Sequence, residues 1–178
     1  TKLDLANYYI SVADGIVRAL RERPCMLHRY PEGVGGEKIY QKRLPKGAPE
    51  WVPTVRVPKK GGTVEHVLAN ETATLVWLAN QNCITPHVFT ARADRLDRPD
   101  RIVWDLDPSG ADEFPLVQRT ALALGALLRE AGCEPFAMTT GSRGIHVVVP
   151  IRRRYGFDAV RAAALAVADA LAEQHPDE

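Results

Sequence analysis

The sequence predicts an α/β fold, an α+β sandwich in which a mixed central sheet is flanked by helices. Apolar residues recur at helical spacing in three long segments, 3–20, 113–131 and 157–174. Between them lie apolar, β-branched runs bounded by Gly and Pro turns, so strands and helices are mixed along the chain. At 178 residues and 46% hydrophobic, the chain is long enough to bury a core, and residues 1–178 are expected to form a single domain.

Hydrophobic spacing and turn residues assign the elements in order. The first half predicts a helix over 3–20, a hairpin of strands over 25–30 and 38–43, an irregular or edge-like segment over 45–58, a strand over 63–68 and a short helix over 73–81. The second half predicts strands over 101–107, 135–140 and 145–151 and helices over 113–131 and 157–174. Gly132 stands where a helix C-cap is expected.

Charge and cysteine content narrow the class of protein. The net charge of +1 combines +6 over residues 1–60 with −5 over 61–140 and zero over 141–178. A basic surface for anions beside an acidic site for cations fits these values, and so do two ordinary solvated surfaces. The three cysteines are odd in number and far apart in the sequence, which argues against a fold held by disulfide bonds. This indicates a reducing, cytoplasmic location. No apolar run reaches the roughly 18 residues that span a membrane.

Two aspartates close the strand expected over 101–107. Residues i and i+2 of a strand point to the same face, so Asp105 and Asp107 present two carboxylates together. Neighbouring carboxylates repel, and a divalent cation such as Mg²⁺ or Mn²⁺ relieves that repulsion. Two strand-end aspartates that cap the turn at 108–110 would give the same pattern. The pair alone therefore leaves metal binding open.

A loop of glycines and small polar residues joins the strands expected over 135–140 and 145–151. Its glycines allow a tight turn with backbone N–H groups facing an anion. The side chains that it offers to a phosphate are Thr140, Ser142, Arg143 and His146. A plain hairpin turn would explain the loop when it is taken alone. Phosphate beside a metal-binding carboxylate pair, however, is the layout of phosphoryl or nucleotidyl transfer.

The two motifs together are recognisable. Val-Trp-Asp-Leu-Asp-Pro over 103–108 and Thr-Gly-Ser-Arg-Gly-Ile-His over 140–146 resemble the archaeo-eukaryotic primase superfamily. More closely, they resemble the polymerase domain of bacterial ligase D, the non-homologous end-joining enzyme, and its stand-alone relatives. Segments 1–4, 29–33, 40–43, 48–51 and 77–81 are similar to the same family, so the resemblance extends over nearly the whole chain.

The resemblance implies a metal-dependent, template-directed nucleotidyltransferase that fills or extends broken DNA ends. Asp105 and Asp107 would be catalytic and would hold two Mn²⁺ or Mg²⁺ ions. The nucleotide would be bound by Thr140, Ser142, Arg143, His146, His87 and His28. DNA would be bound by Lys2, which would grip a 5′-phosphate, by Tyr40, which would stack on template bases, and by Arg29, Ile39, Lys42 and Arg43.

The implied partners follow from the same resemblance. They are double-stranded DNA ends or gapped DNA with a 5′-phosphate, ribo- or deoxyribonucleoside triphosphates, a fused or separate DNA ligase and an end-binding protein. No membrane partner is expected.

The chain departs from the family's pattern at several positions. Thr140 and Arg143 stand where Ser and Lys are usual, His28 stands where Lys is common, and Ile39 replaces an aromatic residue. The family's third metal carboxylate lies on a strand beyond the final helix, whereas this chain ends at Glu178, and a strand expected ahead of Lys2 is also absent. The sequence is therefore expected to be incomplete at both ends relative to the family.

Two other interpretations stay open. Without a third carboxylate, the chain would be a DNA-end-binding module that grips a 5′-phosphate but performs no chemistry. A phosphatase of the haloacid dehalogenase type also carries an apolar strand followed by Asp-x-Asp. That class needs a later lysine, and no lysine follows Lys60. It also leaves the loop at 140–146 and the N-terminal matches unexplained.

Overall fold

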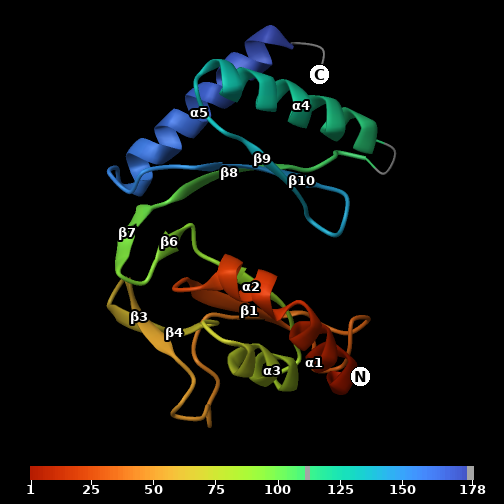
Figure 1. Ribbon diagram of the computed structural model, residues 1–178, viewed down its shortest axis with the longest axis vertical. Coiled ribbons are helices and arrows are strands. Elements are labelled where there is room, and N and C mark those ends of the chain that lie inside the picture. The colour runs from red at the N-terminus through yellow and green to blue at the C-terminus, as the bar shows by residue number, and fades with distance from the viewer. Residues whose placement is uncertain (111–112, 176–178) are drawn as a thin grey trace. The chain divides into compact units, whose positions relative to one another are not determined.

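Two separate hydrophobic cores organise this chain. The computed structural model describes residues 1–110 and 113–175, and the chain divides into two compact units, Thr1–Leu96 and Asp97–Glu178 (Figure 1). Each unit has a sheet, helices and a cluster of buried apolar side chains of its own. In the part of the chain that the structure describes, no helix is long and apolar enough to cross a membrane.

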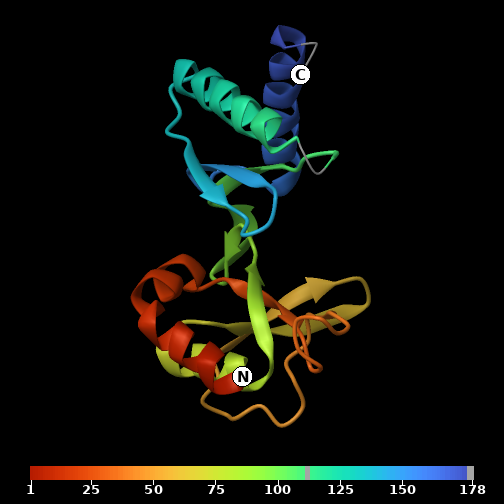
Figure 2. The same ribbon diagram turned by 90° about the vertical axis from the view of Figure 1, so that its right-hand side faces the viewer.

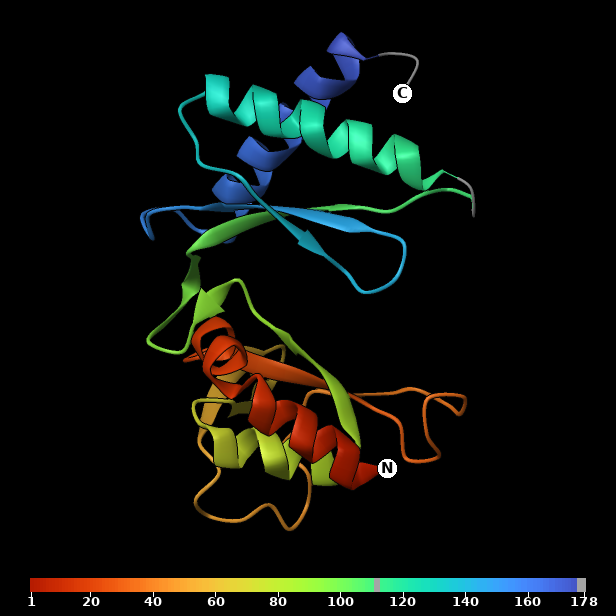
Figure 3. The same ribbon diagram turned by 45° about the vertical axis from the view of Figure 1, so that its right-hand side comes forward.

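The first unit begins with two helices where the sequence predicted one over 3–20. α1 (Lys2–Ser11) starts at a capping box, in which the Asp4 backbone N–H donates to Thr1 Oγ1 at 3.2 Å. The helix is interrupted at Val12, and α2 (Ala13–Leu20) follows. Val12 at the junction has φ of −112° and ψ of 11°, which lie outside the α-helical range. α3 (Thr72–Asn80) packs against α1 (Figures 2 and 3).

Five strands form the sheet of the first unit. They are β1 (Pro24–Arg29), β2 (Ile39–Gln41), β3 (Thr54–Lys59), β4 (Gly62–Leu68) and β5 (Cys83–Val88). Their order is β2-β1-β4-β3, and β5 pairs with β1 off this path. The predicted hairpin of the first two strands is confirmed, with His28 opposite Tyr40.

Two strands of this sheet were not predicted. β3 lies partly in the segment expected to be irregular or edge-like, and β5 lies in a segment for which no element was expected. Each contains a proline, Pro58 and Pro86, which removes a ladder donor and disguises the strand pattern. The prediction of an irregular or edge-like segment over 45–58 is therefore confirmed in part, because its last five residues belong to β3, which lies at the edge of the sheet.

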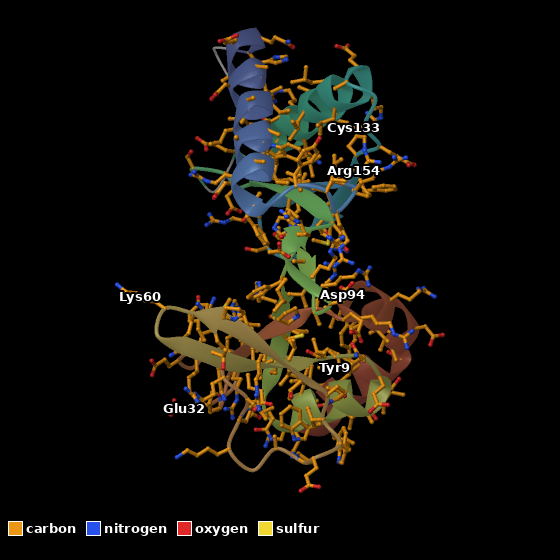
Figure 4. All side chains as sticks on the ribbon, turned by 90° about the vertical axis from the view of Figure 1, so that its left-hand side faces the viewer. Tyr9, Glu32, Lys60, Asp94, Cys133 and Arg154 are labelled. Atoms are coloured by element: carbon orange, nitrogen blue, oxygen red, sulfur yellow. The ribbon has the colours of Figure 1, made fainter. Side chains whose placement is uncertain are left out.

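The core of the first unit lies between its sheet and its helices. Tyr9 of α1 is 1% exposed and packs with Leu27, Leu75 and Leu78 (Figure 4). Its hydroxyl is directed at two carbonyl oxygens of β5, those of Cys83 at 2.9 Å and Ile84 at 2.8 Å. Because a buried hydroxyl needs a partner, these hydrogen bonds fix α1 against the sheet.

The second unit covers one face of a three-stranded sheet with two helices. The strands are β8 (Arg101–Leu106), β9 (Phe136–Thr139) and β10 (Ile145–Pro150), in the order β8-β10-β9. α4 (Phe114–Glu130) and α5 (Phe157–Gln174) lie on the same side of this sheet (Figure 1). Leu124, Leu128, Val147 and Val149 fill the space between helices and sheet. The predicted bounds of these strands and helices agree with the structure to within one residue.

The α/β class predicted from the sequence is confirmed, but the strands do not share one central sheet. They form the five-stranded sheet, the three-stranded sheet and a two-stranded ribbon of β6 (Ala91–Arg92) and β7 (Arg95–Pro99). Each pairing within the two larger sheets is antiparallel, so the expected mixed sheet is wrong. Hairpins account for three of the pairings, β1 with β2, β3 with β4 and β9 with β10, and such links favour antiparallel neighbours.

Replacing Tyr9 with Phe is expected to lower the free energy of unfolding by about 1–3 kcal/mol, because the Cys83 and Ile84 carbonyls lose a buried donor. Urea unfolding monitored by circular dichroism measures the change. Tyr8→Phe is the matched control, because Tyr8 is 57% exposed, and its effect is expected to stay within about 0.5 kcal/mol. Equal effects of the two substitutions would contradict this role for the Tyr9 hydroxyl.

Candidate functional site

The two aspartates of the second unit lie on the sheet face that the helices leave open. On β8, Trp104 and Leu106 pack against the core beneath α4 and α5, and Trp104 Nε1 donates to the Ala164 carbonyl at 3.1 Å. Successive side chains of a strand alternate between faces, so Asp105 points to the opposite side and Asp107 follows it. The Asp105 side chain is 59% exposed, so its carboxylate is hydrated and accessible to a ligand.

His146 is held beside Asp105 by strand pairing. The two residues are direct partners across β8 and β10, and His146 Nε2 lies 2.9 Å from Asp105 Oδ1. A protonated Nε2 donates to that oxygen, orients the carboxylate and leaves its second oxygen available. The sequence predicted His146 near the phosphate loop, and the structure adds this contact with Asp105.

The loop between β9 and β10 is closed by Thr140. Its hydroxyl donates to the Gly144 carbonyl at 3.2 Å and accepts from the backbone N–H groups of Ser142 at 3.3 Å and Gly144 at 3.2 Å. Gly141 adopts a φ of +79°, which favours glycine. These contacts correct one expectation: the N–H groups of Ser142 and Gly144 bind Thr140 inside the loop and do not face outward for an anion.

Ser142 and Arg143 are the outward-facing donors of this loop. Both residues are exposed, and neither side chain has a hydrogen-bond or ion-pair partner among the residues that the structure describes. A guanidinium group and a hydroxyl without partners are well suited to an anionic ligand.

Gly144 brings the loop into direct contact with the second carboxylate. A Cβ atom at this position would collide with Asp107 Oδ1 and would lie 3.0 Å from the Leu106 carbonyl oxygen and 3.3 Å from Thr140 Cγ2. Only glycine therefore lets the loop pack this closely on the end of β8. The carboxylate pair and the loop are thus one cluster, built from Asp105, Asp107, Thr140, Gly144 and His146.

Aromatic rings gather on the sheet of the first unit. The His28 and His87 ring centroids are 3.7 Å apart, and Tyr40 meets His28 edge-on at 4.5 Å. His28 is 7% exposed, and its buried Nε2 has no hydrogen-bond partner among the described residues. Burial, with smaller effects of His87 and Lys38, lowers the pKa of His28 to about 4. His28 is therefore neutral at pH 7.

Two cations meet at the carboxyl end of α3. Lys2 Nζ donates to the Asn80 carbonyl at 2.9 Å, and Arg29 Nε donates to the Gln81 carbonyl at 2.7 Å. The terminal carbonyls of a helix carry partial negative charge, which stabilises both cations. Arg29 Nη1 also donates to Gln41 Oε1 at 2.6 Å. The sequence predicted both residues as DNA contacts, but their shared position at α3 follows only from the fold.

The other candidate DNA residues follow β2. Tyr40 is 59% exposed and Ile39 is 42% exposed, but neighbours on a strand point to opposite faces, so they do not form one stacking surface. Lys42 and Arg43 are exposed just beyond the strand. The sequence did not single out Lys38, whose Nζ lies 4.8 Å from the centroid of the Tyr40 ring. The sequence offered one signal for Lys38: it stands two residues before Tyr40 in an expected strand, and such residues share a face.

The whole chain matches a known protein family. Residues 1–178 match the family described as "LigD, primase-polymerase domain". The chain is 35% identical over 178 residues to "Multifunctional non-homologous end joining protein LigD" of Pseudomonas aeruginosa, covering 99% of this chain and 21% of that protein. It is 34% identical over 152 residues to "Bifunctional non-homologous end joining protein LigD" of Bacillus subtilis, covering 85% and 24%.

The fold of the chain also matches that of a solved structure. It is the "Polymerase Domain from Mycobacterium tuberculosis Ligase D in complex with DNA", with a TM-score of 0.91, 27% identity and coverage of 99% of this chain and 64% of that one. The chain thus spans about a fifth to a quarter of the length of these curated relatives. On the match over residues 1–178, the chain belongs to the LigD primase-polymerase domain family.

Proposed function

We propose that this chain is a metal-dependent, template-directed nucleotidyltransferase that fills or extends broken DNA ends in non-homologous end joining. The observation that carries the proposal is the single cluster in which Asp105 and Asp107 lie beside the loop closed by Thr140, with Gly144 against Asp107. A carboxylate pair next to an anion-binding loop is what transfer of a nucleotide needs. Membership of a family of metal-dependent polymerases supports the same conclusion.

The donors of this cluster fit Mg²⁺ or Mn²⁺. Carboxylate oxygens are the ligands that these cations prefer, and Mg²⁺ is commonly held by one or two carboxylates together with substrate phosphates and water. Among the described residues, no group of three or more His, Cys, Asp and Glu is placed to hold a metal. Asp105 and Asp107 would be protein ligands of the metal, together with phosphate oxygens.

The residues around the metal position divide the remaining work. Bound metal would supply charge neutralisation at the α-phosphate and activation of a primer 3′-hydroxyl. His146 would hold the Asp105 carboxylate in one orientation. Arg143 and Ser142 would bind the outer phosphates, while Thr140 maintains the loop that presents them. Each of these residues would position charged or polar groups before the reaction begins. Such preorganised electrostatic stabilisation of the transition state is usually the largest contribution to the rate.

The first unit would contribute contacts of its own to nucleotide and DNA. Tyr40, exposed beside the His28–His87 stack, offers a ring for a base. Because His28 is neutral, it would contact the nucleotide as a hydrogen-bonding ring and not as a cation. Lys2, beside Arg29, would bind a 5′-phosphate, and Lys42 and Arg43 would follow the backbone.

A ligase, fused or separate, and an end-binding protein would be the partners of this activity. The names of the relatives support this part of the proposal, because both describe LigD as a non-homologous end joining protein with more than one function.

One observation favours a second candidate function. Among the described residues no group of three or more His, Cys, Asp and Glu is placed to hold a metal, and a DNA-end-binding module without chemistry is the alternative. The two candidates differ in nucleotide addition and agree in DNA binding. The phosphatase interpretation has no support left, because family membership accounts for the N-terminal segments that it could not explain.

Replacing Asp105 and Asp107 with Ala is expected to lower nucleotide addition at least about a thousandfold, because the metal loses its protein ligands. The measurement is primer extension with Mn²⁺ on gapped DNA. Binding to the same DNA, measured by fluorescence anisotropy, is expected to change less than about threefold, since the basic side chains proposed to bind the DNA phosphates are unchanged. Asp97→Ala, another exposed aspartate, is the control and should leave extension unchanged. Extension by the double variant at the native rate would remove the two aspartates from the metal site.

Replacing Lys2 with Ala is expected to reduce the preference for 5′-phosphorylated over unphosphorylated gapped DNA about tenfold, the size of one lost charge-assisted hydrogen bond. Competition binding with the two DNAs measures the preference. Lys60→Ala removes the same charge at the β3–β4 turn (Figure 4) and should weaken both DNAs equally. An unchanged preference in Lys2→Ala would exclude Lys2 from the phosphate site.

A further inference from the structure

The open face of the second unit's sheet continues well beyond the aspartates. Direct partners across an antiparallel sheet share a face, so Asp105, His146 and Met138 form one row. The next row on this face is Val103, Val148 and Phe136, and the row after that begins with Arg101 opposite Pro150. The face therefore runs from carboxylates, through apolar side chains, to an arginine end.

The middle of this face is apolar and accessible. Phe136 is 50% exposed and Met138 is 51% exposed, values unusual for large apolar side chains on a sheet that already has one buried face. Aromatic and thioether side chains next to a charged site suit the flat faces of nucleosides.

Beyond Pro150 the chain forms a basic turn, which we call the arginine turn (residues 152–155). The Arg154 backbone N–H donates to the Arg152 carbonyl at 2.7 Å, and the Ile151 backbone N–H donates to the Asp100 carbonyl at 2.9 Å, which ties the turn to the start of β8. Arg152 and Arg154 are exposed, and neither guanidinium has an ion-pair or hydrogen-bond partner among the described residues (Arg154, Figure 4). Tyr155, which closes the turn, is 64% exposed.

Two carboxylates near the arginine turn contact arginines outside it. Asp100 lies 3.3 Å from Arg101, and Asp97 lies 3.4 Å from Arg98. The contacts of these two carboxylates are thus with Arg101 and Arg98 and not with Arg152 or Arg154. The unmatched charges of Arg152 and Arg154 favour a polyanion.

The spacing along the face fits a nucleic-acid strand. Arg101 precedes Asp105 by four residues, which at 3.3–3.4 Å per strand residue places them about 13 Å apart. A strand of duplex DNA carries one phosphate per roughly 3.4 Å of helix axis. A duplex whose axis runs along β8 and whose strand end lies at the carboxylates would therefore bring a phosphate about four nucleotides away to the level of Arg101 and Pro150, where the arginine turn begins.

We propose that Arg152 and Arg154 bind backbone phosphates of the DNA strand whose 3′ end lies at Asp105 and Asp107, about four nucleotides upstream of that end. The inference rests on the proposed function, because that function puts the 3′ end at the carboxylates. Guanidinium groups bind phosphate oxygens through paired hydrogen bonds, and Phe136 and Met138 provide apolar contact for the nucleosides between. A DNA strand is favoured over an acidic protein partner because its phosphates recur at a regular spacing from the end that lies at the carboxylates. The acidic groups of a protein surface have no such spacing.

A double-mutant cycle on protein and DNA tests the proposal. The protein arm is Arg152→Gln with Arg154→Gln. The DNA arm replaces the primer phosphates three to five nucleotides from the 3′ end with neutral methylphosphonates. Affinity is measured by anisotropy over a series of salt concentrations, with no nucleotide or metal added. The double variant is expected to bind natural DNA about tenfold more weakly, and the slope of log affinity against log salt should fall by about 2.

The cycle also fixes which phosphates are involved. The methylphosphonates should weaken the native chain and have little further effect on the double variant, whereas methylphosphonates nine to eleven nucleotides away should affect both equally. Arg119→Gln with Arg129→Gln on α4, which covers the other face, removes the same charge and should leave the coupling intact. Arg152→Lys with Arg154→Lys should retain most of the salt slope, which separates lost charge from lost folding.

Three results would overturn the proposal. The first is an unchanged salt slope in the double glutamine variant. The second is an equal loss of affinity for natural and neutralised primers. The third is a double variant that loses affinity for polyglutamate while keeping its affinity for DNA. The binding assay involves no chemistry, so these outcomes are distinct from a failure of nucleotide addition by Asp105 and Asp107.

Discussion

The site of the second unit depends on the burial of Trp104 and Leu106. Their side chains fill the space beneath α4 and α5, and the hydrogen bond from Trp104 Nε1 to the Ala164 carbonyl fixes the position of β8 against α5. A shift of one residue would expose both apolar side chains and bury two carboxylates, which is costly on each count. The core therefore keeps Asp105 and Asp107 on the open face, and strand pairing then places His146 beside Asp105.

The two units differ in how they accommodate their charged and titratable side chains. In the first, Lys2 and Arg29 are held by the carbonyls at the end of α3, and His28 stays neutral because it is buried against His87. In the second, the acidic end of the open face is separated from the arginine turn by apolar side chains. The near-zero net charge of the chain thus conceals local surfaces of opposite sign, suited to ligands of opposite charge.

The sequence was most informative where a motif and an element coincide. The strand over 101–107 could be predicted because Trp104 and Leu106 alternate with the aspartates, and the loop at 140–146 because its glycines break two apolar runs. The His28–His87 stack could not, because it needs β5, whose Pro86 conceals a strand and whose pairing partner lies far away in the chain. The contact of Lys2 with Asn80 also joins distant segments. Long-range pairings of this kind carry no local pattern in a single sequence.

The central claim is that the carboxylate pair and the loop form one binding site, and Gly144 is where they touch. Calorimetric titration of the chain and its Gly144→Ala variant with a non-hydrolysable nucleoside triphosphate in Mn²⁺ tests this most directly. The added Cβ would displace Asp107 or the loop without demanding an unusual backbone, because Gly144 lies outside the left-handed region. We expect the variant to remain folded and to bind the nucleotide at least about tenfold more weakly, a loss of ~1.4 kcal/mol. An unchanged affinity would contradict the existence of a shared site.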